Sequence, residues 1–156
     1  MDIPATGENG GILIAHNNGF LRRRIKNGLR KNGYIVFEAT RGGQAMDMLL
    51  DQTNDCRISF LIAGTRFLLD SGVSLAGMLT NANLLTKAVL LINDALNERT
   101  IERYRGLCSI PVFESVEWPC GRDDIVEKVL SLSSKISLVR QTGKISAVSH
   151  SGKHIV

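Results

Sequence analysis

The chain has 156 residues, with 44% hydrophobic and 22% charged side chains and a formal net charge of +4, which predicts one globular domain around a single buried core. No apolar run approaches the roughly 20 residues of a membrane-spanning helix, and the aromatic content of 5% is too low for a platform that stacks single-stranded nucleic acid. The three cysteines, Cys56, Cys108 and Cys120, lack Cys-x-x-Cys spacing, so we expect reduced thiols in a cytoplasmic protein rather than disulfides or a zinc site.

In chain order, short apolar runs alternate with segments of helical periodicity. Residues 1–10 are polar and glycine-rich and predict a loose N-terminal lead. The predicted strands are Gly11–Ala15, Tyr34–Ala39, Ile58–Ala63, Ala88–Ile92 and a fifth that begins at Ile110. The predicted helices have apolar faces at Leu21, Ile25 and Leu29; at Ala45, Met46, Leu49 and Leu50; over Val73–Leu79; over about Ala95–Arg105; and at Ile125, Val129, Leu130 and Leu132.

Breaks between these elements carry recognisable end signals. Asn17 or Asn18 is placed to cap the first helix, and Asn32-Gly33 to end it. Leu68–Ser71 is predicted as a loop, and Gly106 as the end of the fourth helix. The acidic pair Asp123-Asp124 suits the start of the last helix.

Strand-helix alternation of this kind predicts a three-layer α/β sandwich with a five-stranded parallel sheet and five helices. We expect the domain to span residues 11–134. Residues 135–156 turn polar and basic, and we expect either a flexible tail or a linker to a further domain. In such a sheet, chemistry collects at the carboxyl ends of the strands.

Basic residues cluster in the first predicted helix. Arg22, Arg23, Arg24, Lys26, Arg30 and Lys31 all lie there. Such a cluster could attract nucleic acid or an acidic partner. A solvated helix face is the simpler interpretation, and we do not expect direct nucleic-acid binding.

Several segments, taken together and in order, resemble the receiver domain of bacterial two-component response regulators. The likeness covers about Gly11 to Leu132, and it implies a CheY-like, flavodoxin-type sheet with strand order 2-1-3-4-5. It rests on the helix and turn Phe20–Tyr34, the Glu-Ala-x-x-Gly-x-x-Ala segment at Glu38–Ala45, the turn Asp70–Val73, the segment Arg103–Leu107 and Pro119.

Receiver chemistry requires a set of polar groups that this chain lacks. In that family an acidic pair after the first strand and an aspartate after the third hold Mg²⁺, and the aspartate accepts a phosphoryl group. A Ser or Thr after the fourth strand and a Lys before a proline contact the phosphoryl oxygens. The aligned residues here are His16 and Asn17 for the acidic pair, Gly64 for the acceptor, Asn93 for the hydroxyl and Trp118 for the lysine.

This pattern predicts a degenerate pseudo-receiver with no metal, no cofactor and no enzymatic activity. Each position also has a structural interpretation: Gly64 as a turn residue, and His16 as a hydrogen-bonded structural histidine. Trp118 could anchor a partner or fill the vacated pocket. Asp70 and Asp94 could cap the helices that follow them, and whether either serves as a displaced acceptor stays open.

The function that we expect is regulatory protein-protein interaction without phosphorylation. A sensor kinase, an output domain or a second copy of the chain would be the partner. The receiver likeness places the candidate interaction surface at Glu98, Arg99, Glu102, Arg103, Tyr104, Phe113 and Trp118. The alternatives are a small-molecule-sensing domain and a nucleic-acid-associated transcriptional regulator.

Overall fold

A computed structural model describes residues 11–51, 58–70, 75–82 and 86–149 of the chain. The predicted N-terminal lead at residues 1–10 lies outside this part. The elements are, in order, β1 (Gly11–Ala15), α1 (Gly19–Lys31), β2 (Val36–Ala39), α2 (Gly42–Leu50), β3 (Ile58–Gly64), α3 (Thr65–Asp70), α4 (Leu75–Ala82), β4 (Ala88–Asn93), α5 (Glu98–Leu107), β5 (Val112–Glu117) and α6 (Arg122–Ser149).

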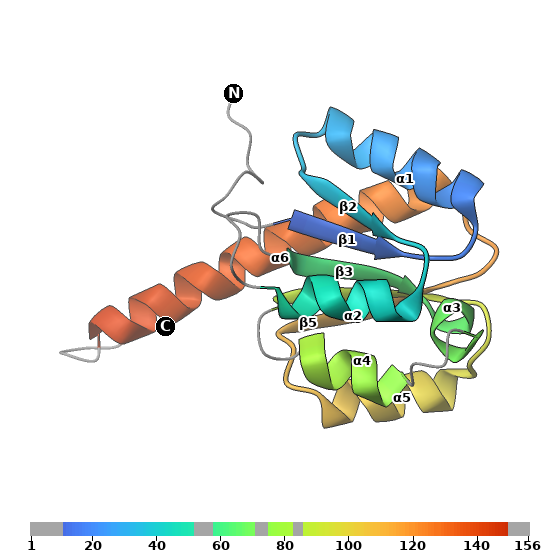
Figure 1. The fold of residues 1–156 in the computed structure, drawn as a ribbon. Coiled ribbons are helices and arrows are strands. Elements are labelled where there is room, and N and C mark those ends of the chain that lie inside the picture. Colours follow the sequence, from blue (N-terminus) through green and yellow to red (C-terminus); the bar gives the residue numbers. More distant parts are fainter. Residues whose placement is uncertain (1–10, 52–57, 71–74, 83–85, 150–156) are drawn as a thin grey trace.

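The strands form one parallel sheet in the order β2-β1-β3-β4-β5. Helices α1 and α6 cover one face of the sheet, and α2, α4 and α5 cover the other (Figure 1). The predicted three-layer architecture and strand order are therefore confirmed. Both faces are covered because the central strands are predominantly apolar, and every residue of β4 is buried.

Alternate side chains along the strands point to opposite faces of the sheet and pack in two separate hydrophobic cores. Ile12 and Ile14 point to the side of α1 and α6, where Ile25 and Val129 pack against them. On the opposite side, the core formed by Leu13 and Ala15 receives apolar residues from α2, α3, α4 and α5. The prediction that Leu130 belongs to the buried apolar face of the last helix is wrong, because this residue is 38% exposed.

The first helix begins and ends as predicted. Asn18 is the N-cap, and its Oδ1 accepts a hydrogen bond from the Leu21 amide at 3.0 Å. The helix ends at Lys31, and Gly33 follows with a φ of 86°, a left-handed conformation that glycine adopts without strain.

Two segments differ from the prediction. Residues 65–70, which include the first residues of the predicted loop, form α3. The next helix is described over Leu75–Ala82, and the predicted start at Val73 lies outside the described residues. Helix α5 begins at Glu98 because the Asn97 side chain accepts from the Thr100 amide at 2.8 Å, and it runs through Gly106 to Leu107.

The last helix, α6, extends past the end of the predicted domain. It continues to Ser149 and projects beyond the sheet (Figure 1). The helix therefore crosses the expected boundary at residue 134, and the division into domain and tail stays a prediction. None of the described helices combines the length and apolarity that crossing a membrane would require.

Candidate functional site

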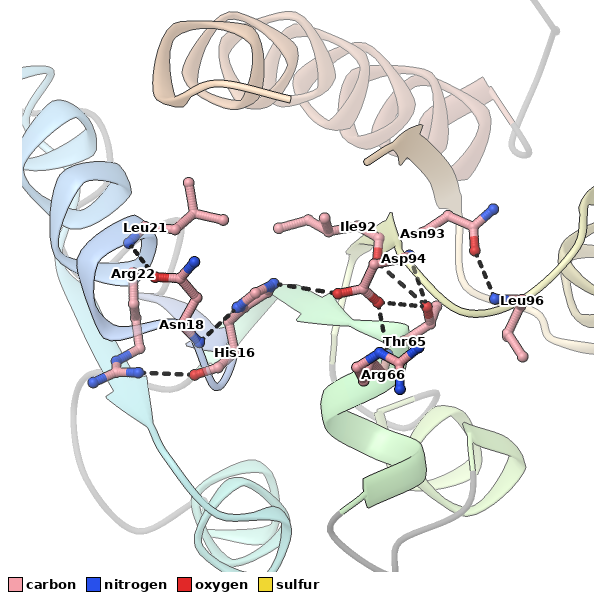
Figure 2. Close-up of polar contacts among 10 residues, drawn as sticks. All are labelled: His16, Asn18, Leu21, Arg22, Thr65, Arg66, Ile92, Asn93, Asp94 and Leu96. Carbon is pink, nitrogen blue, oxygen red and sulfur yellow. Dashed lines mark hydrogen bonds and ion pairs between the residues drawn. The ribbon is translucent and has the colours of Figure 1, made fainter. Parts of the chain in front are cut away.

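The carboxyl ends of β1, β3, β4 and β5 lie side by side. In the sheet register Ala15 pairs with Ala63, Gly64 with Ile92, and Asn93 with Glu117. The residues that follow these positions therefore meet at one edge, which we call the carboxyl edge: His16, Thr65, Asp94 and Trp118. Figure 2 shows the polar contacts there.

The His16 ring occupies the space above Gly64. His16 is only 2% exposed. A Cβ placed on Gly64 would lie 2.6 Å from His16 Cδ2 and 2.9 Å from His16 Nε2, closer than side-chain atoms approach. Glycine at position 64 is therefore required by the close approach of the imidazole, and no larger side chain fits while the ring holds this position.

The two ring nitrogens of His16 have different surroundings. Nδ1 accepts a hydrogen bond from the Asn18 backbone N–H at 3.0 Å, and Arg22 Nη1 donates to the His16 carbonyl at 2.8 Å. Because Nδ1 is an acceptor, the neutral ring carries its proton on Nε2. Among the described residues Nε2 has no hydrogen-bond partner, and Asp94 Oδ2 lies 3.8 Å away (Figure 2).

The environment of His16 favours the neutral ring. Burial lowers its pKa below the usual 6.5, and the Arg22 guanidinium lowers it further, while the nearby Asp94 carboxylate offsets part of this effect. A neutral, buried imidazole beside a glycine is a poor ligand set for a hard dication such as Mg²⁺. Within the described ranges, no group of three or more His, Cys, Asp or Glu side chains could hold a metal ion.

Asp94 caps α3 across the edge. Its Oδ1 accepts hydrogen bonds from Thr65 Oγ1 at 3.0 Å and from the Arg66 amide at 2.8 Å, and its own amide donates to Thr65 Oγ1 at 3.1 Å (Figure 2). A carboxylate at a helix N-terminus is stabilised by the unpaired amides there. The prediction that Asp94 caps the following helix is thus wrong, since Asn97 caps α5.

The second predicted carboxylate, Asp70, is the last residue of α3 and is exposed. The segment between Asp70 and the next helix, residues 71–74, lies outside the described part of the chain. The prediction that Asp70 caps that helix therefore stays a prediction. Its role as a displaced acceptor stays a prediction.

The Asn93 side chain is buried and hydrogen-bonded to neighbouring residues. It is 5% exposed, its Nδ2 donates to Glu117 Oε1 at 3.1 Å and Oε2 at 3.0 Å, and its Oδ1 accepts from the Leu96 amide at 3.0 Å. Both polar atoms of the side chain are thus hydrogen-bonded within the protein itself.

Trp118 packs against the His16 ring and is partly exposed, and its role as a partner anchor stays a prediction. Its ring centroid lies 6.0 Å from that of His16, with the planes tilted by 32°, and the residue is 39% exposed. Its backbone N–H donates to the Asn93 carbonyl at 3.1 Å, which fixes the chain after β5. The indole therefore shields His16 on one side and leaves aromatic surface accessible on the other.

Asn17 is separated from this cluster. It is exposed and lines an open pocket of about 350 Å³ with Thr40, Arg41, Gly42, Gly43, Phe67 and Asp70. The pocket thus lies between the β1–α1 and β2–α2 turns and α3.

Most of the predicted interaction surface is accessible. Glu98, Arg99, Glu102 and Arg103 are exposed on α5, and Tyr104 is half-buried against the core. Phe113 is a correction: it is 6% exposed, packs in the core, and lies under the Arg105 guanidinium at 5.5 Å. It therefore contributes nothing to the accessible surface.

Part of the basic cluster on α1 is neutralised. Glu38 on β2 accepts from Arg22 at 2.8 Å and from Lys26 at 2.6 Å. Burial opposes ionisation of Glu38, but the hydrogen bonds and charges of Lys26 and Arg22 outweigh it and lower its pKa. The remaining cations, Arg23, Arg24, Arg30 and Lys31, are exposed, as a solvated helix face would be.

Two of the contacting residues at this edge follow from position in the sequence. Thr65 directly follows Gly64 and Glu117 directly precedes Trp118, so parallel pairing predicts both at the same edge. Sequence reasoning missed Arg22, which comes from α1 and donates to the His16 carbonyl at 2.8 Å.

No protein-family model matches the chain, and no curated protein matches it significantly. Solved structures do share its fold. An adenylate cyclase from Rhodopirellula baltica is 17% identical at a TM-score of 0.63, covering 85% of this chain and 93% of that one. A response regulator from Thermotoga maritima is 16% identical at a TM-score of 0.58, covering 80% and 98%.

A response regulator from Burkholderia pseudomallei, with a phosphorylated aspartic acid, a calcium ion and citrate, is 13% identical at a TM-score of 0.55 and covers 90% of this chain and 86% of that one. At such identities the likeness shows the fold alone. The chain therefore has the fold of CheY-like receiver domains.

Proposed function

We propose that the chain is a receiver-like signal-transduction module that is not phosphorylated at the usual position and acts by protein-protein interaction. One observation carries the proposal: the His16 imidazole fills the space above Gly64, where a receiver has its acceptor carboxylate. The position has neither a nucleophile nor room for one.

The neighbouring groups support the same interpretation. The carboxylate of Asp94 is committed to the N-terminus of α3, and Asn93 is engaged by Glu117 and the Leu96 amide. Positive charge that could stabilise a phosphoryl group is also missing at the end of β5, because the residue there is Trp118 rather than a lysine.

Accessible residues on α5 and at the end of β5 supply the proposed docking surface. Glu98, Arg99, Glu102 and Arg103 present a mixed-charge face, and Trp118 adds partly exposed aromatic surface. Aromatic side chains of this kind frequently dominate the binding energy of interfaces. A protein partner, including a second copy of the chain, is the expected ligand.

A phosphoryl mimic tests the proposal. Titration of the ¹⁵N-labelled chain with Mg²⁺ and beryllofluoride should leave the amide resonances of Gly64, Thr65, Asn93 and Asp94 unchanged, because there is no carboxylate to which the mimic can bind. A receiver domain with an intact acidic set, measured in the same buffer, verifies that the reagent is active. Saturable shifts at these amides that need both components would contradict the proposal.

A further inference from the structure

His16 is held in a position that suits only its neutral form. Its Nδ1 accepts from the Asn18 N–H at 3.0 Å, and Asn18 is also the residue whose side chain caps α1. A protonated imidazole has N–H groups on both nitrogens and no acceptor. Protonation at Nδ1 would therefore set two donors against each other in the β1–α1 turn.

The opposite side of the ring offers the charged form an alternative partner. Nε2 is buried without a hydrogen bond, and the Asp94 carboxylate lies 3.8 Å away, just beyond bonding distance. An imidazolium would be drawn to this carboxylate. The same carboxylate caps α3 through Thr65 and Arg66, so a movement toward His16 weakens that cap.

From this geometry we infer that the carboxyl edge is a proton-operated switch. In the neutral state His16 holds the β1–α1 turn and Asp94 holds α3. In the charged state His16 releases the Asn18 amide and pairs with Asp94, and the starts of α1 and α3 loosen together. A proton thus takes the place at this edge that a phosphoryl group has in a receiver.

Few other charges act on the ring. Arg22 of α1 donates to the His16 carbonyl and opposes protonation, while Asp94 favours it. Gly64 of β3 has no side chain, and β5 contributes the uncharged Trp118, preceded by Glu117, which Asn93 engages. The Cys120 thiol stays protonated, because burial, Asp124 and Asp94 all raise its pKa. Protonation of His16 below its usual pKa of 6.5 is the charge change on which the proposed switch depends.

The inference builds on the proposed function, because it names a signal that replaces phosphate. Its test needs neither a partner nor a phosphoryl donor, so failure of the test leaves the proposed function standing. The chain contains one tryptophan, Trp118, and its ring lies 6.0 Å from His16. Its fluorescence therefore reports on the surroundings of the His16 ring.

The experiment is a pH titration of the full chain, followed by Trp118 fluorescence and by NMR of the His16 ring and the Asn18 and Arg66 amides. We expect a single transition with a midpoint below 6.5, the usual pKa of histidine. The Asn18 and Arg66 resonances should move with the same midpoint as the ring. His16→Gln should remove the transition, and the double variant His150→Gln/His154→Gln should keep it.

Two results would overturn the inference. One is a His16 ring that remains neutral at every pH at which the chain is folded. The other is a ring that titrates while the Asn18 and Arg66 amides do not move. Both are read from the wild-type chain, so the inference stays testable even if His16→Gln fails to fold.

Discussion

At the scale of single residues, His16 and Gly64 depend on each other. The imidazole lies where a Cβ at position 64 would be, and the absence of that Cβ is what lets a histidine ring be buried at the end of β1. The glycine is therefore one half of a packing arrangement in which an imidazole, a glycine and an indole lie together at the carboxyl edge.

Gly64→Ala is expected to destabilise the fold by about 1–3 kcal/mol, because the added methyl overlaps the His16 ring in a closely packed site. The free energy of unfolding from urea denaturation measures this cost. Gly106→Ala is the matched control: nothing lies within 4 Å of a Cβ at this exposed helical position. There alanine should stabilise by about 0.5–1 kcal/mol.

A double-mutant cycle between His16 and Gly64 shows whether Gly64→Ala destabilises the chain by overlap with the imidazole or by backbone strain. In the His16→Ala background, Gly64→Ala should cost at least about 1 kcal/mol less than in the wild type. Equal costs in both backgrounds would mean that the ring is not what excludes a side chain at position 64.

At the scale of elements, the most consequential unit is the link between the β4–α5 turn and α3. Asp94 joins them through the Thr65 hydroxyl and the Arg66 amide. Helix α3 has 6 residues and is too short to be stable on its own. The Asp94 cap and the burial of Phe67 and Leu68 therefore hold it in place.

Asp94→Ala should lower the free energy of unfolding by about 1–3 kcal/mol, since it removes a charge-assisted cap that is largely screened from water. Hydrogen exchange at the α3 amides should accelerate more than exchange in the sheet. Asp47→Ala, at an exposed position on α2, is the control and should change stability by less than about 0.5 kcal/mol. Unchanged exchange in α3 would show that Asp94 is not its cap.

The elements that the sequence predicted best are those whose signals are local. Strands such as Ala88–Ile92 are apolar throughout, and α1 has both its cap and its terminating glycine within reach of its own segment. Helix α3 was missed because its cap comes from Asp94, which is 29 residues beyond Thr65. The pattern of residues 65–70 alone does not indicate a capping residue that is so far away in the sequence.

The residues of the carboxyl edge were predictable only as a set of positions. Parallel pairing indicated that His16, Gly64, Asn93 and Trp118 would lie together, and they do. Which of them would fill the acceptor space depends on rotamers and contacts that one sequence does not reveal. Phe113 was misjudged for a similar reason, since an aromatic residue in an edge strand can face either the core or the solvent.

At the scale of the whole molecule, the chain has the fold of a receiver domain, with an imidazole, a glycine and an indole at the carboxyl edge of its sheet. The two apolar cores are formed by side chains within the strands and helices, whereas the polar contacts of the edge lie at the strand ends. One fold can therefore carry different chemistry at this edge. The proposed function is accordingly tested at the edge itself.

The most direct measurement is the intact mass of the chain after incubation with Mg²⁺ and a small phosphoryl donor such as acetyl phosphate, with a phosphorylatable receiver in the same mixture as the positive control. The mass of this chain should stay unchanged, because position 64 offers no carboxylate and the His16 ring fills the space above it. A Mg²⁺-dependent gain of one phosphoryl group, mapped to Asp94, Asp70 or His16, would contradict the account.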